Sequence, residues 1–276
     1  MREKAPQVAL VTGSTDGLGR AVALALAAAG FEVLIHGRDA ARGADLVRQI
    51  HGQGGSAAFH RADFGSLAQV RALADSVHAT HDRLHLLINN AGIGPGGGPA
   101  PRRISADGHE LTFAVNYLAG YLLTRLLLPS LGRGAPARIV NVTSAGQYPL
   151  DFGNLMLTRA YSGMRAYAQS KLAQVMLTFD LALELRDRGI TVNCLHPATY
   201  MDTAMVRGAG ATPTSTVAEG MEAVMQLAVA TEFAGRTGEY CDGLTPSRAN
   251  AQAYDPQARR RLAEVSATLA GLGAAP

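Results

Sequence analysis

Short apolar runs alternate with longer amphipathic stretches along most of this chain. Seven of the short runs have the length and composition of strands: 7–12, 32–36, 56–60, 84–89, 137–143, 190–195 and 238–241. Between them, apolar residues recur with helical spacing over six stretches: 18–29, 40–51, 66–79, 108–131, 160–187 and 214–230. Strands that alternate with helices build a parallel sheet with helices on both faces. The pattern therefore predicts a single doubly wound α/β domain over 1–276, with a seven-stranded parallel sheet.

Three segments interrupt this alternation, and each follows a predicted strand: 93–103, 145–166 and 197–213. In an open parallel sheet, ligands bind outside the carboxyl ends of the strands. We therefore expect these insertions to surround a pocket at that edge of the sheet.

Two of the insertions carry apolar side chains. Those of the middle insertion suit either a lipophilic substrate or a covering of the core, and both interpretations fit Tyr148, Leu150, Phe152, Leu155, Met156 and Leu157. In the last insertion, candidates for a mobile lid over the pocket are Met201, Met205 and Val206.

Composition narrows the class of protein. The chain has 276 residues, 47% hydrophobic and 17% charged, which is typical of a globular domain. The net charge is +3, and the one basic cluster, 259–261, lacks the interleaved aromatics of a nucleic-acid surface. Cys194 and Cys241 are too few for a disulfide framework and lack metal-ligand spacing. The polar start and the absence of an apolar run of 18 residues predict neither a signal peptide nor a membrane span. We expect a soluble cytoplasmic protein with no metal and no nucleic-acid partner.

The first predicted strand leads into a glycine-rich turn that opens the first helix. In such a turn, glycines permit a tight bend, a close approach of the backbone to a pyrophosphate and close packing of the helix on the sheet. The helix N-terminus then faces the anion. The spacing here is GxxxGxG, and glycine-rich turns also occur without a ligand. Its place after the first strand favours a dinucleotide site formed by Gly13, Ser14, Thr15, Asp16, Gly17, Leu18 and Gly19.

The end of the second strand selects the form of the dinucleotide. NAD-specific sites place an acidic residue there against the ribose, whereas an arginine accommodates the 2′-phosphate of NADP. Gly37 stands where the acid would be, and Arg38 beside it can bind a phosphate with two hydrogen bonds. Asp39 is the counterargument, because it can face the ribose or pair with Arg38, and Arg38 is alternatively an exposed loop charge. We expect NADP(H) to be preferred and NAD(H) to be possible.

Residues after the third and fourth strands complete the predicted cofactor site. Asp63 and Phe64 follow the third strand, where Asp63 can reach the adenine edge or cap the next helix. Asn90, Ala91 and Gly92 follow the fourth strand, and their small side chains let a cofactor lie across the sheet edge. A simple Asn- and Gly-rich turn has the same composition.

A tyrosine and a lysine are paired on the predicted helix 160–187. Proton transfer to a carbonyl oxygen needs a group that gives and retakes a proton near neutral pH, and a tyrosine with a pKa of about 10 is poorly matched. A cation one helical turn away lowers that pKa, and Tyr167 and Lys171 have this spacing. Of 25 basic residues only Lys4 and Lys171 are lysines, which argues against a chance pairing. The alternative is a structural tyrosine with its hydroxyl at the surface.

Two further polar residues fall near the same edge. Ser144 follows the strand 137–143 and can hold a substrate oxygen, with Thr143 as a competitor. Asn116 lies within an otherwise apolar helix, where a buried amide must find partners. A water that bridges Asn116 to Lys171 would supply one partner and extend into a proton relay.

Taken together, these residues resemble the short-chain dehydrogenase/reductase family. Nearly the whole chain is covered, and the family's elements occur in order as Thr12-Gly13-xxx-Gly17-x-Gly19, Asn89-Asn90-Ala91-Gly92, Asn116, Ser144, Tyr167-xxx-Lys171, His196-Pro197 and Thr203. The resemblance implies a Rossmann-type domain that binds a nicotinamide cofactor, with Pro197 and Thr203 among the cofactor-binding residues. The stretch Arg165 to Gln174 and the sequence His36 to Asp39 are most similar to the retinol-dehydrogenase-like branch.

The resemblance also implies roles for the four candidate catalytic residues. Tyr167 would be the general acid/base, and Lys171 would bind the nicotinamide ribose and lower the pKa of the tyrosine. Ser144 would orient the substrate, and Asn116 would maintain a water relay. Two departures from the branch remain: Ala198 replaces a glycine and Gln174 replaces an asparagine.

The sequence thus predicts an oxidoreductase that transfers a hydride between NADP(H) and the carbonyl or alcohol group of a hydrophobic small molecule. The alternative is a catalytically silent, cofactor-binding regulator with the same fold. The combination of Ser144, Tyr167 and Lys171 favours the enzyme, because a binding module does not need it. The long helices 108–131 and 160–187 are candidates for a homodimer or homotetramer interface.

Overall fold

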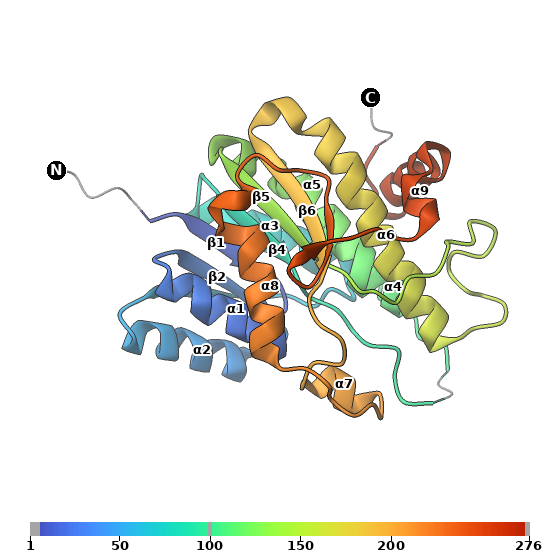
Figure 1. Ribbon diagram of the computed structural model, residues 1–276, viewed down its shortest axis with the longest axis horizontal. Coiled ribbons are helices and arrows are strands. Elements are labelled where there is room, and N and C mark those ends of the chain that lie inside the picture. Colours follow the sequence, from blue (N-terminus) through green and yellow to red (C-terminus); the bar gives the residue numbers. More distant parts are fainter. Residues whose placement is uncertain (1–5, 99–100, 274–276) are drawn as a thin grey trace.

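A twisted sheet lies between two groups of helices in the computed structural model, which describes residues 6–98 and 101–273 (Figure 1). Positions 99–100 of the predicted insertion 93–103 lie outside the described residues, as does Lys4. The strands are arranged in the order β3-β2-β1-β4-β5-β6-β7-β8. This order reverses between β1 and β4, which is the switch point where doubly wound folds bind ligands. The predicted fold class is therefore confirmed.

Within the described residues the sheet has eight strands, one more than expected: β1 (Val8–Val11), β2 (Glu32–Gly37), β3 (Ser56–Arg61), β4 (Leu86–Asn89), β5 (Ala137–Val142), β6 (Ile190–His196), β7 (Tyr240–Asp242) and β8 (Thr245–Pro246). The first seven are parallel, as predicted. β8 is antiparallel to β7 and follows it after a two-residue turn that begins at Gly243, where φ is 56°. Glycine at this place is typical of tight hairpins. A two-residue strand is too short for an apolar pattern to reveal it.

The six predicted helices are all present, with boundaries shifted by a few residues: α1 (Gly17–Ala28), α2 (Ala40–Gly52), α3 (Leu67–Thr80), α4 (Leu111–Phe113) continued by α5 (Ala119–Arg133), α6 (Gly163–Glu184) and α8 (Val217–Val229). Two further helices among the described residues, α7 (Ala204–Gly208) and α9 (Pro256–Leu269), lie outside the six predicted stretches. A π-helical turn at Ala114–Leu118 joins α4 to α5, so the predicted helix 108–131 is interrupted. π-Helical turns are frequent at functional sites. Helix α7 lies within the predicted insertion 197–213 and is too short to show a helical period.

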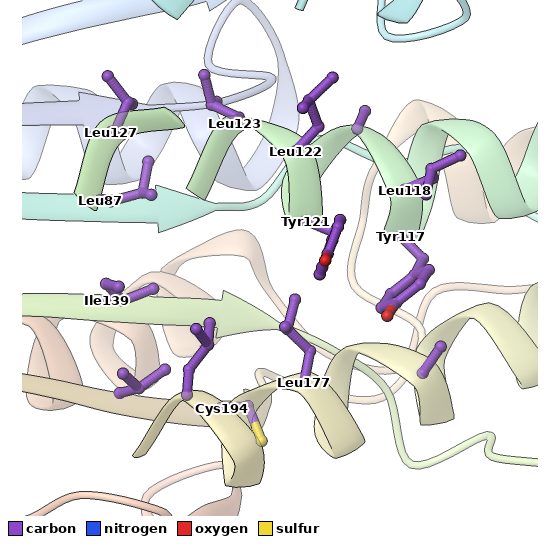
Figure 2. Packing of buried hydrophobic residues seen from close by; sticks show 14 of the residues in the cluster. Leu87, Tyr117, Leu118, Tyr121, Leu122, Leu123, Leu127, Ile139, Leu177 and Cys194 are labelled. Carbon is purple, nitrogen blue, oxygen red and sulfur yellow. The ribbon is translucent and has the colours of Figure 1, made fainter. Parts of the chain in front are cut away.

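Two apolar layers hold the helices to the sheet. Along β1, Val8 and Leu10 belong to the layer under α3, α5, α6 and α9, whereas Ala9 and Val11 belong to the layer under α1, α2 and α8. This alternation follows from the two-residue period of a strand, and it makes β1 apolar throughout because both faces are covered. Figure 2 shows part of the first layer, with Ile139 of β5 among its members.

One helix among the described residues, Leu111–Arg133, is long and apolar enough to cross a membrane by length and composition. A helix was predicted here over 108–131, but no membrane-spanning candidate was expected, because no continuous apolar run reaches 18 residues. In the structure, 72% of its most apolar window is buried against the rest of the protein. Its apolar character is therefore explained by its position in the core, where it packs on α3 and the sheet.

Candidate active site

Ser144 and Tyr167 meet at the carboxyl edge of the sheet. Ser144 lies two residues beyond the end of β5, and Tyr167 lies in the second turn of α6, which begins after the N-cap Ser162. The two side chains are hydrogen-bonded to each other. The hydroxyl of Ser144 also accepts a hydrogen bond from the N–H of Gly146 at 3.1 Å. Burial raises the pKa of Tyr167, and the hydrogen bond with Ser144 lowers it, with a net increase.

Lys171 lies one turn after Tyr167 and is 5% exposed. Its ammonium donates to the carbonyl of Val142 and to Oε1 of Gln174, both at 3.0 Å, and lies 5.7 Å from the centre of the Tyr167 ring. Burial lowers the pKa of Lys171 to about 8. In the structure, burial and the hydrogen bond with Ser144 are the main influences on the pKa of Tyr167, and the ammonium of Lys171 donates to two other groups. An ammonium has three donors, so one donor remains for a further partner.

Asn116 is 1% exposed and lies in the π-helical turn before α5. Its Oδ1 accepts from the N–H of Ile93 at 2.7 Å, and its amide donates to the carbonyl of Ile93 at 3.0 Å and to the hydroxyl of Ser170 at 3.1 Å. Both amide donors are thus bonded to protein, and the side chain joins the segment after β4 to α6. The predicted water bridge to Lys171 therefore has no free N–H of this amide to use.

The glycine-rich turn is fastened to the end of β4. The hydroxyl of Thr12 accepts from the N–H groups of Asn90 at 2.9 Å and Ala91 at 3.0 Å, and the Asn90 amide donates to the carbonyls of Thr12 and Gly13. Gly13 has a φ of +63°, and a β-carbon there would lie 2.8 Å from Cα of Ala91. Asn90 and Ala91 therefore hold the turn in place through hydrogen bonds and close backbone packing.

The side chains of the turn have different environments. Ser14 is buried and donates to the carbonyl of Val11 at 2.8 Å, and Leu18 is buried in the apolar layer. Gly19 packs against the backbone of Gly13 and the amide of Asn90. Thr15, Asp16 and the backbone remain at the surface of the turn, with Asp16 as the N-cap of α1.

The turn and its surroundings suit a pyrophosphate. Gly17 has a φ of +50°, and a β-carbon there would lie 3.4 Å from the methyl group of Thr203, so the insertion after β6 lies over the turn. Thr203 is the N-cap of α7, and Pro197 at the start of this insertion is buried. Gly92 leaves space beside Asn116 and Lys171, because a β-carbon there would lie 3.2 Å from Asn116 Oδ1 and 3.8 Å from Lys171 Nζ. These residues can hold an extended dinucleotide along the sheet edge.

At the end of β2, Asp39 caps a helix and does not pair with Arg38. Its Oδ1 accepts from the N–H groups of Ala41 at 2.9 Å and Arg42 at 3.1 Å, which makes Asp39 the N-cap of α2. Its other oxygen lies 3.5 Å from the Arg42 side chain, so Asp39 pairs with Arg42 and not with Arg38. Arg42, which also lies 3.0 Å from Asp16, is a basic residue beside the cofactor site that the sequence analysis missed.

Asp63 and Phe64 have roles that differ from one another. Asp63 accepts from the N–H of Gly65 at 2.9 Å and lies 3.9 Å from Arg38, while the N-cap of α3 is Ser66. The ring of Phe64 is buried and stacks on His36, with ring centres 4.3 Å apart. The ring of Phe64 is therefore not exposed for contact with a cofactor.

The three predicted insertions converge at this edge. A β-carbon at Gly94 would lie 2.8 Å from Met205, and one at Gly97 would lie 3.2 Å from the carbonyl of Gly208. Gly163, at the start of α6, packs against the carbonyl of Pro95. The segment after β4 is thus enclosed between α7 and α6.

The apolar side chains of the middle insertion divide between the two predicted roles. Leu150 and Leu155 are buried in the apolar layer, and Phe152 and Met156 pack against it. Leu157 is also buried, outside that layer. Tyr148 is 53% exposed, and its N–H lies 3.3 Å from the carbonyl of Ala168, next to Tyr167. Most of this insertion covers the core, and Tyr148 is left at the mouth of the site.

Comparisons with known proteins agree with this geometry. The sequence profile of the short chain dehydrogenase family matches residues 7–214. Retinol dehydrogenase 13 of Homo sapiens is 35% identical over 285 residues, covering 96% of this chain and 85% of that protein. Polyprenol dehydrogenase of Mus musculus is 36% identical over 288 residues, covering 97% and 84%.

Solved structures with the same fold include NADP complexes. A short chain dehydrogenase from Burkholderia cenocepacia in complex with NADP has a TM-score of 0.70 and 30% identity, covering 88% of this chain and 97% of that one. The Pseudomonas aeruginosa RhlG/NADP active-site complex has a TM-score of 0.70 and 29% identity, covering 86% and 94%. The chain therefore belongs to the short-chain dehydrogenase family of oxidoreductases, in its retinol-dehydrogenase-like branch, and has a site for a nicotinamide dinucleotide.

Proposed function

We propose that this protein transfers a hydride between NADP(H) and the carbonyl or alcohol group of a hydrophobic small molecule, with Tyr167 as the general acid/base. The observation that carries the proposal is the hydrogen bond between Ser144 and Tyr167 beside the buried ammonium of Lys171. All three lie at the sheet edge that the glycine-rich turn also reaches. A binding module without chemistry does not require a buried lysine next to a serine–tyrosine pair.

The residues divide the reaction between them. A bound nicotinamide supplies or accepts the hydride. Ser144 and Tyr167 are hydrogen-bonded to each other, so both hydroxyl groups can bind the same substrate oxygen. Tyr167 gives its proton to that oxygen in reduction and retakes it in oxidation. The ammonium of Lys171, 5.7 Å from the centre of the Tyr167 ring, would favour the anion of the phenol through its third donor.

The charges at the end of β2 support a preference for NADP(H). Arg42 is paired with Asp16 and Asp39, whereas Arg38 has a 70% exposed side chain and one distant partner, Asp63 at 3.9 Å. An exposed ion pair of this length contributes little. Arg38 is therefore available to bind a 2′-phosphate with two hydrogen bonds.

Replacement of Arg38 tests this preference. We expect Arg38→Ala to weaken NADPH binding about tenfold or more while NADH binding changes little, because a hydrogen-bonded charge contributes about 1.5–3 kcal/mol. Titration calorimetry with both nucleotides measures the ratio. Arg48→Ala is the matched control, since Arg48 is also exposed and pairs with an aspartate on α2. An unchanged ratio in Arg38→Ala would place the phosphate contact elsewhere.

The substrate class is supported by two kinds of observation. Exposed apolar side chains lie around the site: Tyr148 beside Ala168, Met205 against Gly94 and Met164 one turn before Tyr167. The names of the relatives specify retinol and polyprenol, which are lipophilic alcohols. NADPH consumption with a series of aldehydes and ketones of increasing chain length tests the class, and turnover that rises with chain length is expected. A protein that binds NADPH but reduces none of them would be a cofactor-binding regulator.

A further inference from the structure

The ammonium of Lys171 is held by neutral groups. Besides the carbonyl of Val142 at the end of β5, its partner is Oε1 of Gln174, three residues later on α6, at 3.0 Å. Gln174 is itself buried, at 4% exposure. Water therefore does not compete strongly for either end of this hydrogen bond, and the side-chain carbonyl of Gln174 replaces hydration of the charge.

No carboxylate forms an ion pair with Lys171 among residues 6–98 and 101–273. The titratable groups that face it are Tyr167 on its own helix and His196 at the end of β6. Burial lowers the pKa of His196, with a smaller lowering by the charge of Lys171, so this neighbour does not stabilise the ammonium. The carbonyl dipoles of Val142 and Gln174 stabilise the ammonium instead.

A buried hydrogen-bond network fixes Gln174 relative to the sheet. Thr178 donates to the backbone carbonyl of Gln174 at 2.9 Å and accepts from the amide of Asn141 at 2.8 Å. Asn141 in turn accepts from the amide of Asn89 at 2.8 Å. The network runs from α6 across β5 to the end of β4. The turn of helix that carries Gln174 thus has a defined distance from Val142.

We propose that Gln174 is a positioning residue for the reaction: its side-chain carbonyl holds the ammonium of Lys171 between Val142 and Tyr167 and keeps it charged. The proposal rests on the proposed function in one respect, namely that the charge of Lys171 serves the proton transfer of Tyr167. Gln174 touches neither the tyrosine nor the glycine-rich turn in the contacts described above, so it acts through Lys171. It is one of the two positions where this chain departs from its branch.

The charge of Lys171 is sensitive to such a partner. Burial lowers its pKa to about 8, so the amine is close to neutral at mildly alkaline pH. Gln174→Leu removes the acceptor and lowers the pKa further, because a neutral amine is then favoured by burial. Gln174→Glu has the same shape, adds a negative charge and raises the pKa.

The lysine content of the chain permits a direct measurement. Because Lys4 and Lys171 are the only lysines, the full chain labelled with ¹³Cε-lysine in a Lys4→Arg background gives one lysine signal for titration by NMR, without cofactor or substrate. We expect a midpoint near 8 for the unchanged site. The midpoint moves down by about 0.5 or more in Gln174→Leu and up by about 1 or more in Gln174→Glu. Midpoints that stay together in all three proteins overturn the proposal.

Thr178→Val is the matched control. It removes the hydrogen bond to the backbone of Gln174 but leaves the side-chain carbonyl, so we expect lower stability with a nearly unchanged lysine midpoint. A midpoint shift in Thr178→Val as large as that in Gln174→Leu would reduce Gln174 to a structural role and contradict the proposal. Gln174→Glu keeps the test valid if Gln174→Leu does not fold, since glutamate and glutamine have the same shape.

Kinetics separate this proposal from the proposed function. The alkaline limit of kcat for carbonyl reduction is expected to follow the NMR midpoint, earlier in Gln174→Leu and later in Gln174→Glu. Shifted NMR midpoints in a protein without turnover on any carbonyl sustain the positioning of Lys171 and contradict the proposed function. Turnover whose pH limit is the same in all three proteins sustains the function and contradicts the role of Gln174.

Discussion

The two halves of α6 carry different kinds of side chain. The first half, taken as far as Gln174, carries polar and charged groups: Ser170, Lys171 and Gln174 are buried, and Tyr167 is half-buried. The second half buries leucines, and Figure 2 shows Leu177 within the apolar layer below α5. A helix of 22 residues thus combines an active-site segment with a core segment.

The contrast shows what each half contributes to the free energy of folding. Each buried leucine removes apolar surface from water and stabilises the fold by about 1.5–3 kcal/mol. The ammonium of Lys171 is desolvated without a counter-ion, which lowers its pKa and opposes folding. The apolar half therefore offsets the cost of a buried charge in the polar half, as expected if the polar half serves the proposed reaction.

Replacement of the buried charge gives the largest expected effect. Lys171→Met keeps the length of the side chain but removes the ammonium, so we expect kcat for carbonyl reduction to fall by about 10³-fold, within the range for loss of acid/base assistance. Steady-state NADPH oxidation measures the loss. Turnover within about threefold of the unchanged protein would mean that the polar half of α6 is not an active-site segment.

The stability of Lys171→Met relative to the unchanged protein is also expected to depend on pH. The pKa of Lys171 is about 8 in the folded protein and has an ordinary value of 10.5 when unfolded, so its penalty is fully present below pH 8 and disappears as pH rises to 10.5. Relative to the unchanged protein, Lys171→Met is expected to lose about 2 kcal/mol of stability between pH 7.5 and pH 9.5. Urea unfolding at both pH values measures this. A difference that is independent of pH contradicts the buried charge.

A truncation in the apolar half is expected to reduce stability while leaving kcat unchanged. Leu181 is 1% exposed and lies in the layer between α6 and the sheet. We expect Leu181→Ala to reduce the free energy of unfolding by about 2–5 kcal/mol, because it removes apolar contacts and leaves a cavity. The folded fraction should retain the kcat of the unchanged protein. A large loss of kcat at full folding would show that the two halves are not separable.

The smallest expected effect concerns the start of the helix. Ser162 caps α6 by accepting from the N–H of Arg165 at 3.4 Å. Ser162→Ala is expected to cost about 1 kcal/mol of stability, measured by urea unfolding. Ser66→Ala, at the N-cap of α3, is the control, with a similar loss and no change in kcat. If only Ser162→Ala alters kcat, the cap positions Tyr167 as well as the helix.

Much of this arrangement is visible in the sequence because it follows from local patterns. The alternation of apolar runs and amphipathic stretches gave the parallel strands, and strand ends located Ser144, Asn90 and the glycine-rich turn at one edge. The four-residue spacing placed Tyr167 and Lys171 on one helix. Strand positions and the spacing of residues on a helix both depend on short stretches of sequence, so they can be predicted without knowledge of the tertiary structure.

The contacts of individual side chains were harder to predict from the sequence, because they depend on segments that are distant along the chain. The stacking of Phe64 on His36 and the pairing of Arg42 with Asp16 join residues of different elements. The third case is Lys171, whose ammonium donates hydrogen bonds to Val142 and Gln174 and lies over the ring of Tyr167. A helical spacing of four permits a contact, but competition from buried acceptors decides which contact forms.

The most direct test of the account compares two tyrosines with similar spacing. Tyr167 precedes Lys171 by four residues, and Tyr161 precedes Arg165 by four. We measure NADPH affinity and kcat for carbonyl reduction in Tyr167→Phe and in Tyr161→Phe. The account predicts that Tyr167→Phe binds NADPH normally and loses kcat by about 10²–10⁴-fold, while Tyr161→Phe retains both. Undiminished kcat in Tyr167→Phe would contradict the assignment of Tyr167 as the acid/base.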